Sequence, residues 1–140
     1  MKPGQTFSAN GREFHSPTLV TRYKALMIDF LLILFALVAI MVAVGESESR
    51  TTVMVSSAFI LLLAYEPLLT SYSRTIGQRL MRIRVGRYDN PSERIPLINA
   101  YIRWFVKGLL GWISFITIHF NDERRAIHDL TSNSVMTSDE

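Results

Sequence analysis

Three apolar stretches, separated by polar segments, run along this chain of 140 residues. The first, Ala25 to Val44 (ALMIDFLLILFALVAIMVAV), carries a single charge, Asp29. A helix of this length extends for about 30 Å, the thickness of the hydrocarbon core of a bilayer. Thirteen of its residues are Leu, Ile, Val or Phe, and each favours insertion by roughly 0.3 to 0.6 kcal/mol against roughly 3 kcal/mol for one central acid. The stretch is therefore predicted to span a membrane as a helix.

The second stretch, Val53 to Tyr72, is less apolar because it holds nine such residues and includes Glu66 and Pro67. The same sum leaves its insertion marginal, so we expect it to need the first helix as a partner. Only the short segment from Gly45 to Thr52 separates the two stretches. Such a connection predicts a tight antiparallel hairpin.

The third stretch, Trp104 to Phe120, is shorter than the first two and lies at the lower limit of length for crossing a bilayer. It either spans the membrane or forms a re-entrant segment broken at Gly108 and Gly111. Two short segments, Leu80 to Val85 and Ser134 to Thr137, have a β-like pattern, and they can pair only if both lie on one side of the membrane. This pairing favours the re-entrant alternative slightly, and both remain open.

The pattern as a whole predicts an all-α integral membrane protein with one domain. Two transmembrane helices form a hairpin, and a third membrane-embedded helix is spanning or re-entrant. The expected segments are an N-terminal tail over 1–24, a membrane domain over 25–120 with helices at about 25–44, 53–72 and 104–120 and a basic loop over 73–103, and a C-terminal tail over 121–140.

Composition supports this class and excludes others. Hydrophobic residues make up 49% of the chain, and the mean hydropathy is +0.21, which is high for a soluble domain. The net charge of +3 does not indicate a nucleic-acid partner, because the positive residues flank the apolar stretches. There is no cysteine, so disulfides and thiolate sites are excluded. The polar segment 1–24 lacks a cleavage pattern, so the first helix is expected to be retained.

The arginines predict the orientation, because short cytoplasmic loops are enriched in Lys and Arg. The loop from Gly45 to Thr52 has two Glu and one Arg, whereas the segment 73–103 contains seven arginines. The N-terminus and the basic loop are therefore expected to be cytoplasmic. These arginines are spread along the sequence, so orientation is a better explanation for them than binding of anionic lipid headgroups. They are Arg74, Arg79, Arg82, Arg84, Arg87, Arg94 and Arg103.

Two acids carry the functional hypothesis. Counted by helix rise, Asp29 lies roughly 6 Å and Glu66 roughly 9 Å from the cytoplasmic ends of adjacent helices. Pro67 removes a backbone donor and frees carbonyls beside Glu66, so the acids could hold a small cation or share a proton. The alternative is structural: both acids pair with arginines of the basic loop, such as Arg79 or Arg103, and lock the hairpin.

Other chemistry has little support. His15, His119 and His128 lack metal-ligand spacing, so no metal site is expected. The sequence has no phosphate loop and no hydrolase elbow. We therefore expect no enzyme activity and no cofactor.

Several motifs in order resemble one family. Arg22 to Asp29 (RYKALMID) matches the opening Arg-x-x-Ala-x-x-x-Asp of the RDD family, which is named for one arginine and two aspartates. Further matches are Glu66 ahead of Thr75 to Val85 (TIGQRLMRIRV, with Gly77), Arg103 before the third apolar stretch, and Arg125 to Leu130 (RAIHDL) followed by Ser134 and Val135.

The resemblance implies that Arg22, Asp29 and Asp129 are the signature residues of a small helical membrane protein of bacterial type, in the cytoplasmic (inner) membrane. It also implies a link to transport, including cation/proton antiport in some members. The chain departs from the family pattern at Ile76 and Gln78, where proline and lysine are common.

Two hypotheses follow. The first is an integral membrane protein that assists ion or small-solute transport through Asp29 and Glu66. Because two or three helices barely enclose a polar path, this hypothesis requires a homo-oligomer or a membrane partner besides the lipid bilayer. The second is a non-transporting accessory or assembly protein whose buried charges are structural.

Overall fold

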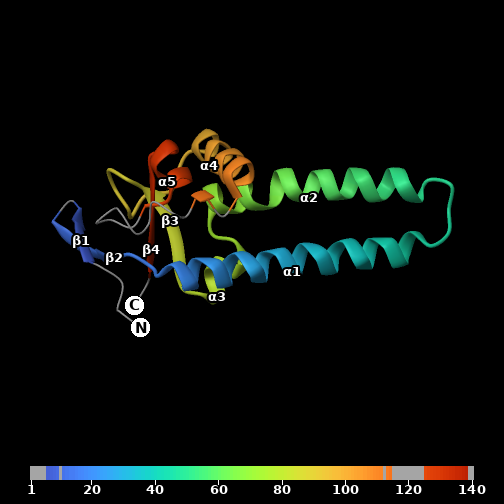
Figure 1. Ribbon diagram of the computed structural model, residues 1–140, viewed down its shortest axis with the longest axis horizontal. Helices are drawn as coiled ribbons and strands as arrows, with labels where there is room; N and C mark the ends of the chain where they lie inside the picture. The colour runs from blue at the N-terminus through green and yellow to red at the C-terminus, as the bar shows by residue number, and fades with distance from the viewer. Residues whose placement is uncertain (1–5, 10, 112, 115–124, 139–140) are drawn as a thin grey trace.

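Two long helices project together from a smaller mixed region in the computed structural model, which describes residues 6–9, 11–111, 113–114 and 125–138 (Figure 1). The helices are α1 (Leu19–Val44) and α2 (Arg50–Tyr72). They lie side by side and antiparallel, and a short loop joins their far ends (Figure 1). We call the remaining described elements, β1 to β4 and α3 to α5, the head.

The ends of α1 have clear local causes. Thr18 is its N-cap, and the side-chain oxygen of Thr18 accepts the backbone N–H of Thr21 over 3.2 Å. Gly45, with φ of 61°, ends the helix. The helix thus begins at Leu19, ahead of the expected Ala25, because the cap lies in the polar segment.

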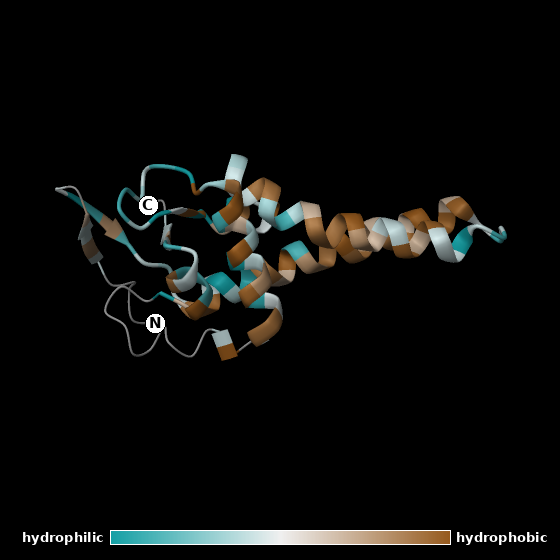
Figure 2. Ribbon diagram, turned by 90° about the horizontal axis from the view of Figure 1, so that it is seen from above, coloured by the Kyte–Doolittle hydropathy of each residue, from teal (hydrophilic) through white to brown (hydrophobic). Residues whose placement is uncertain are grey.

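The surfaces of α1 and α2 suit lipid. Both helices are long and apolar enough to cross a membrane, and in their most apolar 18 residues 0% and 6% of positions are buried within the protein. Figure 2 shows hydrophobic residues all along the pair. Large side chains such as Phe35, Val42 and Phe59 point outward with exposures of 65% to 72%. In water this surface would be unfavourable, whereas in hydrocarbon it carries no penalty.

A four-stranded sheet in the head corrects the expectation of an all-α protein. Its strands are β1 (Thr6–Ala9), β2 (Arg12–His15), β3 (Ile83–Arg87) and β4 (Ser134–Ser138), in the order β1-β2-β4-β3. The first two form an antiparallel ladder of four residue pairs in which the rings of Phe7 and Phe14 stack 5.8 Å apart. A sequence read only for long apolar runs misses such short strands.

The pairing expected between two β-like segments is confirmed. β3 and β4 are antiparallel with five residue pairs, although β3 is Ile83–Arg87 and not 80–85. Buried apolar residues from both strands and from α1 and α4 form the core of the head. They are Ala25, Ile83, Val85, Ile95, Ala100 and Met136.

Three further helices complete the head: α3 (Ile76–Leu80), α4 (Leu97–Leu110) and α5 (Ile127–Thr131). α3 packs on α1 and β3, α4 packs on α2 and α5, and α5 also contacts β4. α4 begins earlier than the expected Trp104 and ends at Gly111, whose φ is 52°. Residues 112 and 115–120 of the expected third helix lie outside the described residues. At 14 residues, α4 is about 21 Å long, which is too short to cross hydrocarbon.

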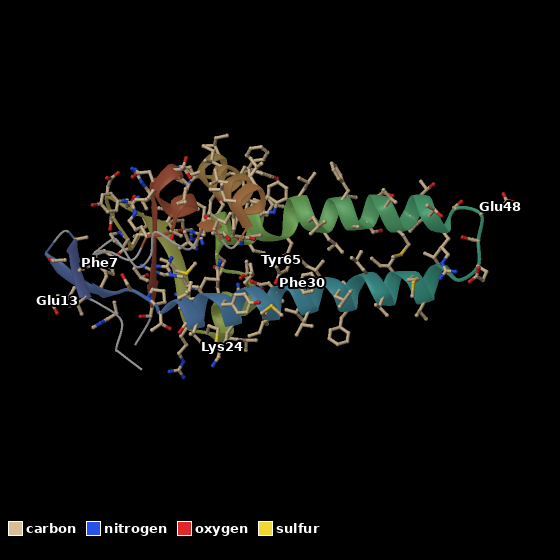
Figure 3. The ribbon with its side chains drawn as sticks, in the orientation of Figure 1. Phe7, Glu13, Lys24, Phe30, Glu48 and Tyr65 are labelled. Carbon is tan, nitrogen blue, oxygen red and sulfur yellow. The ribbon has the colours of Figure 1, made fainter. Side chains whose placement is uncertain are left out.

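The β3–β4 ladder constrains topology, because paired strands must share one side of a membrane. Single cysteines can report this, since the chain has none. Asp89→Cys and Thr131→Cys are both exposed and flank the ladder, whereas Glu48→Cys lies at the distant loop (Figure 3). In sealed vesicles, a membrane-impermeant maleimide should label Asp89→Cys and Thr131→Cys from the same side and Glu48→Cys from the opposite side.

Labelling of Asp89→Cys and Thr131→Cys from opposite sides would contradict the β3–β4 pairing in the membrane-bound protein. Labelling of each variant after detergent is added is the control for reactivity.

Candidate functional site

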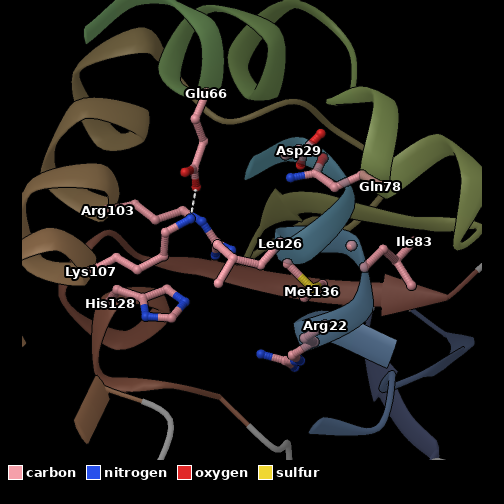
Figure 4. A pocket seen from close by; sticks show the side chains of 11 residues that line it. Arg22, Leu26, Asp29, Glu66, Gln78, Ile83, Arg103, Lys107, His128 and Met136 are labelled. Carbon is pink, nitrogen blue, oxygen red and sulfur yellow. Dashed lines mark hydrogen bonds and ion pairs between the residues drawn. The ribbon is translucent and has the colours of Figure 1, made fainter. Parts of the chain in front are cut away.

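A cavity of about 30 Å³ lies where α1, α2 and α4 meet the sheet (Figure 4). Its lining includes three cations, Arg22, Arg103 and Lys107, and two acids, Asp29 and Glu66. A space of this size holds about one or two water molecules. The cavity therefore marks a junction at which charges from distant parts of the chain meet.

Asp129, in α5, binds two arginines that are far from it in sequence. Arg22 Nη1 donates to Oδ2 over 2.7 Å, and Arg103 Nη1 donates to Oδ1. The backbone N–H of Ala126 also donates to Oδ2, over 3.2 Å. Asp129 is fully buried and each arginine is only 3% exposed, so these bonds replace the water that the charges have lost. One carboxylate therefore connects α1, α4 and α5.

Arg125 holds the backbone of Asp129 in place. Its Nε donates to the carbonyl oxygen of Ser134 over 3.0 Å, and its Nη2 donates to the carbonyl oxygen of Asp129 over 3.3 Å. The guanidinium also lies 3.9 Å from the ring centroid of Tyr88. α5 is thereby held against β4 and against the segment that follows β3.

A second ion pair joins α2 to α4. Lys107 Nζ donates to Glu66 Oε1, and the two side chains retain 16% and 20% exposure. Burial lowers the pKa of Arg103 to about 10. The negative charge of Glu66 opposes this shift, and the positive charge of Arg22 adds to it. Arg103 consequently stays charged at neutral pH.

Opposite charges meet at this junction. Three cations, Arg22, Arg103 and Lys107, lie close to three acids, Asp29, Glu66 and Asp129. Opposite charges at close range lower the free energy of holding these groups away from water. The six residues therefore form one charge network between the long helices and the head.

Among the described residues, the partners of Asp29 are uncharged hydrogen-bond donors and no cation. Tyr65 Oη donates to Oδ1 over 2.8 Å, Thr75 Oγ1 donates to Oδ2 over 2.6 Å, and the backbone N–H of Gly77 donates to Oδ1 over 2.7 Å. Thr75 is also the N-cap of α3, where its Oγ1 accepts the N–H of Gln78. Asp29 thus attaches α1 to both α2 and α3.

Gly77 permits this attachment because α3 packs closely on α1. A Cβ at this position would lie 2.1 Å from the carbonyl oxygen of Ala25 and 2.9 Å from Asp29 Cγ. No side chain fits at that distance from a backbone atom. The absence of a side chain at position 77 therefore sets the separation of the two helices.

His128 and Ser114 form a buried polar pair beside the network. Ser114 Oγ accepts the backbone N–H of His128 over 3.2 Å and lies 2.5 Å from His128 Nδ1. The tautomer of the ring decides which of these two atoms donates. The other ring nitrogen, Nε2, lies 3.6 Å from Asp129 Oδ1. Burial lowers the pKa of His128 well below its ordinary value, and the charges of Arg103, Lys107 and Arg22 lower it further. Ser114 and His128 are 0% exposed. The serine hydroxyl of this pair is therefore packed away from the surface and is not an accessible nucleophile.

The two acids singled out from sequence both line the cavity but have different neighbours. In Figure 4 Glu66 points toward Lys107, whereas Asp29 lies beside Gln78. The expectation of an arginine partner is wrong for Arg79, whose Nη2 donates to Ser73 Oγ over 3.0 Å. Arg103 lies near Glu66 but bonds to Asp129.

Three partners at this site were not found by sequence reasoning: Lys107, Tyr65 and Thr75. Lys107 lies four residues after Arg103, so one face of a helix presents both cations. This spacing indicates from the sequence alone that the two cations lie together. Pro67 is buried within α2, and the helix continues through it to Tyr72.

The geometry defines a membrane protein in which two long apolar helices are joined to a polar head through buried charges. The model of the RDD family matches residues 16–133, so the chain belongs to the RDD family, whose members are membrane proteins. Arg22, Asp29 and Asp129, the residues implied as its signature, all lie at this junction. Neither the curated proteins nor the solved structures contain a match.

Replacing Gly77 with alanine should separate α3 from α1. The added Cβ meets the Ala25 carbonyl oxygen at 2.1 Å, and relief of this overlap should lower the free energy of unfolding by about 2–3 kcal/mol. Gly108→Ala is the matched control, because nothing lies within 4 Å of its Cβ and an alanine in a helix adds about 1 kcal/mol. Unfolding of the detergent-purified protein in a denaturant series measures both changes, and equal stability of the two variants would contradict the close packing.

His128 should make stability depend on pH. The unfolded chain takes up a proton near pH 6.5 whereas the folded chain does not, so stability is complete above that pH and falls as the pH decreases. The slope is at most about 1.4 kcal/mol per pH unit. His128→Asn, which keeps a hydrogen-bonding group near Nδ1, should flatten the dependence between pH 7.5 and 5.5 in detergent.

His15→Asn is the control, and it should retain the slope of the unmodified protein. A flat profile in the unmodified protein would show that His128 is accessible to protons in the folded state.

Proposed function

We propose that this protein is a non-transporting accessory or assembly protein of a bacterial cytoplasmic membrane. In this proposal, α1 and α2 cross the membrane as a hairpin, and the head binds to their base through the charge network. The hairpin then presents its outer surface to a membrane partner or to a second copy of the chain.

One observation carries the proposal: each of the three acids at the junction is already bonded within the chain. Asp129 binds Arg22 and Arg103, Glu66 binds Lys107, and Asp29 accepts three hydrogen bonds. A site that loads and releases a cation needs a carboxylate with open coordination positions. Carboxylates that already have partners within their own chain favour a structural role.

The distribution of charge supports the orientation. The head carries the arginines of residues 73–103, whereas the loop between α1 and α2 contains Glu46 and Glu48 and the N-terminal residue of α2 is Arg50. By the positive-inside rule, the head and the N-terminus are cytoplasmic.

The exposed apolar surface supports a partner. Leu34, Phe35 and Val38 of α1 and Val55 and Phe59 of α2 are all more than 40% exposed. Two helices leave most of their surface to lipid or to another protein, and packing between helices in lipid depends on close surface fit. A homo-oligomer is the simplest partner of this kind.

Ion or small-solute transport is the second candidate function, and a different observation favours it. Asp29 and Glu66 line both the 30 Å³ cavity and an apolar groove of about 380 Å³ between α1, α2 and Trp104. The groove reaches the two acids from the lipid-facing surface. Such a route would allow a proton or small solute to approach them.

Reconstitution in liposomes separates the two functions. With a pH-sensitive dye inside, the unmodified protein should give no signal above empty liposomes when Na⁺ or K⁺ is added outside. The detergent-purified protein should have a protein mass above that of one 16.0 kDa chain, measured by size-exclusion chromatography with light scattering. Glu66→Gln should lower the free energy of unfolding by about 1 kcal/mol, because Lys107 loses its partner in a partly exposed position.

Glu48→Gln, at the distant loop, is the matched control and should change neither quantity. Cation-driven pH changes that Glu66→Gln or Asp29→Asn abolishes, with stability retained, would replace the first proposal by transport. A monomeric, inactive protein would contradict transport and the homo-oligomer, and a different membrane protein would then be the partner.

A further inference from the structure

A second pocket, of about 290 Å³, lies in the head and is lined by three arginines, Arg74, Arg84 and Arg94. They are evenly spaced along the sequence, each ten positions after the one before. The fold brings them together because Arg74 follows α2, Arg84 lies in β3 and Arg94 precedes α4. We propose that this pocket binds the phosphate group of an anionic phospholipid at the membrane surface.

The charge of the pocket suits phosphate. Glu93 is its one acid among the described lining residues, and that carboxylate is already bonded to Asn90 Nδ2 over 2.9 Å and to Arg87 over 3.4 Å. The described lining thus holds three arginines and one glutamate. Guanidinium groups bind phosphate with paired N–H donors, which makes arginine suited to this ligand.

The walls provide order and further donors. Arg84 Nη2 donates to the carbonyl oxygen of Pro91 over 2.7 Å, which fixes the guanidinium. A guanidinium has more N–H donors than this bond uses, so others can bind a ligand. Ser73 and Ser92 also line the pocket. Ser73 Oγ accepts from Arg79 Nη2, so its own proton can be donated to a phosphate oxygen.

The location identifies a lipid as the source of the phosphate. Ser73 and Arg74 directly follow Tyr72, the last residue of the candidate membrane span. Ser71 Oγ donates to the carbonyl oxygen of Ile95 over 3.2 Å, so the end of the span is fixed beside the Arg94 segment. This step rests on the proposed spanning of α2, which places the pocket at headgroup level.

The test uses the full chain in detergent and two double variants of equal charge. Arg74→Gln with Arg94→Gln removes two pocket arginines, whereas Arg12→Gln with Arg82→Gln removes two exposed arginines outside the pocket. Native mass spectrometry with phosphatidylglycerol, phosphatidylcholine or inorganic phosphate reports binding. The unmodified protein should prefer phosphatidylglycerol, and the pocket variant should bind it about tenfold or more weakly, given that a hydrogen bond to a charged group contributes about 1.5–3 kcal/mol.

The control variant should retain binding within about twofold. Equal losses of binding in both variants would overturn the proposal, because binding would then follow net charge alone. Equal binding of phosphatidylcholine and phosphatidylglycerol would also overturn it. Binding of inorganic phosphate without a lipid preference, lost only in the pocket variant, would keep the phosphate site and identify a soluble source. If the double variant in the pocket is destabilised, the single variant Arg94→Gln replaces it, because Arg94 is exposed. The lipid-binding result does not depend on whether the protein transports ions.

Discussion

The buried carboxylate of Asp129 holds the junction together, because it is the point at which α1, α4 and α5 converge. Its two arginines come from positions 107 and 26 residues away in sequence. Removing one partner from a buried ion pair leaves an uncompensated charge, at a cost of about 3–5 kcal/mol. A loss of that size is comparable to the whole stability of a small domain. The arrangement of head and helices therefore depends on a few charged atoms more than on apolar burial.

Apolar packing alone would specify this junction poorly. The outer surfaces of α1 and α2 suit lipid, and the core of the head is small, with six buried apolar residues in its cluster. Hydrogen bonds and ion pairs have direction, so they fix rotation and register where a small core does not. The Asp29 carboxylate does this for α3, and Gly77 lets the two backbones come close enough for it.

The sequence was sufficient for the parts governed by hydropathy. The two candidate spans were expected, and so was the β3–β4 pairing, because alternation is visible in both segments. The strands β1 and β2 were missed, although Asn10-Gly11 between two short segments with aromatic residues is a strong hairpin signal. An interpretation based on hydropathy alone overlooks this hairpin signal, because the N-terminal tail is polar.

The candidate site was predicted in its members but not in its bonds. Depth along adjacent helices placed Asp29 and Glu66 at one level, and both do line one cavity. Helix rise gives height but not rotation, so it could not tell that Asp29 faces Tyr65 and Thr75 while Glu66 faces Lys107. The likeness to the RDD family supplied Asp129, which has no periodicity that points to Arg22. Contacts between positions so far apart in sequence require the fold itself.

The wide spacing of Arg22 and Asp129 also sets an order of events during synthesis. At about 5–20 residues per second, roughly 5–20 s pass between the two residues leaving the ribosome. In that interval both candidate spans have been made, yet Arg22 has no Asp129 and β3 has no β4. The head can close only after both candidate spans have been synthesised. Its ion pairs are therefore among the last contacts that the chain can form.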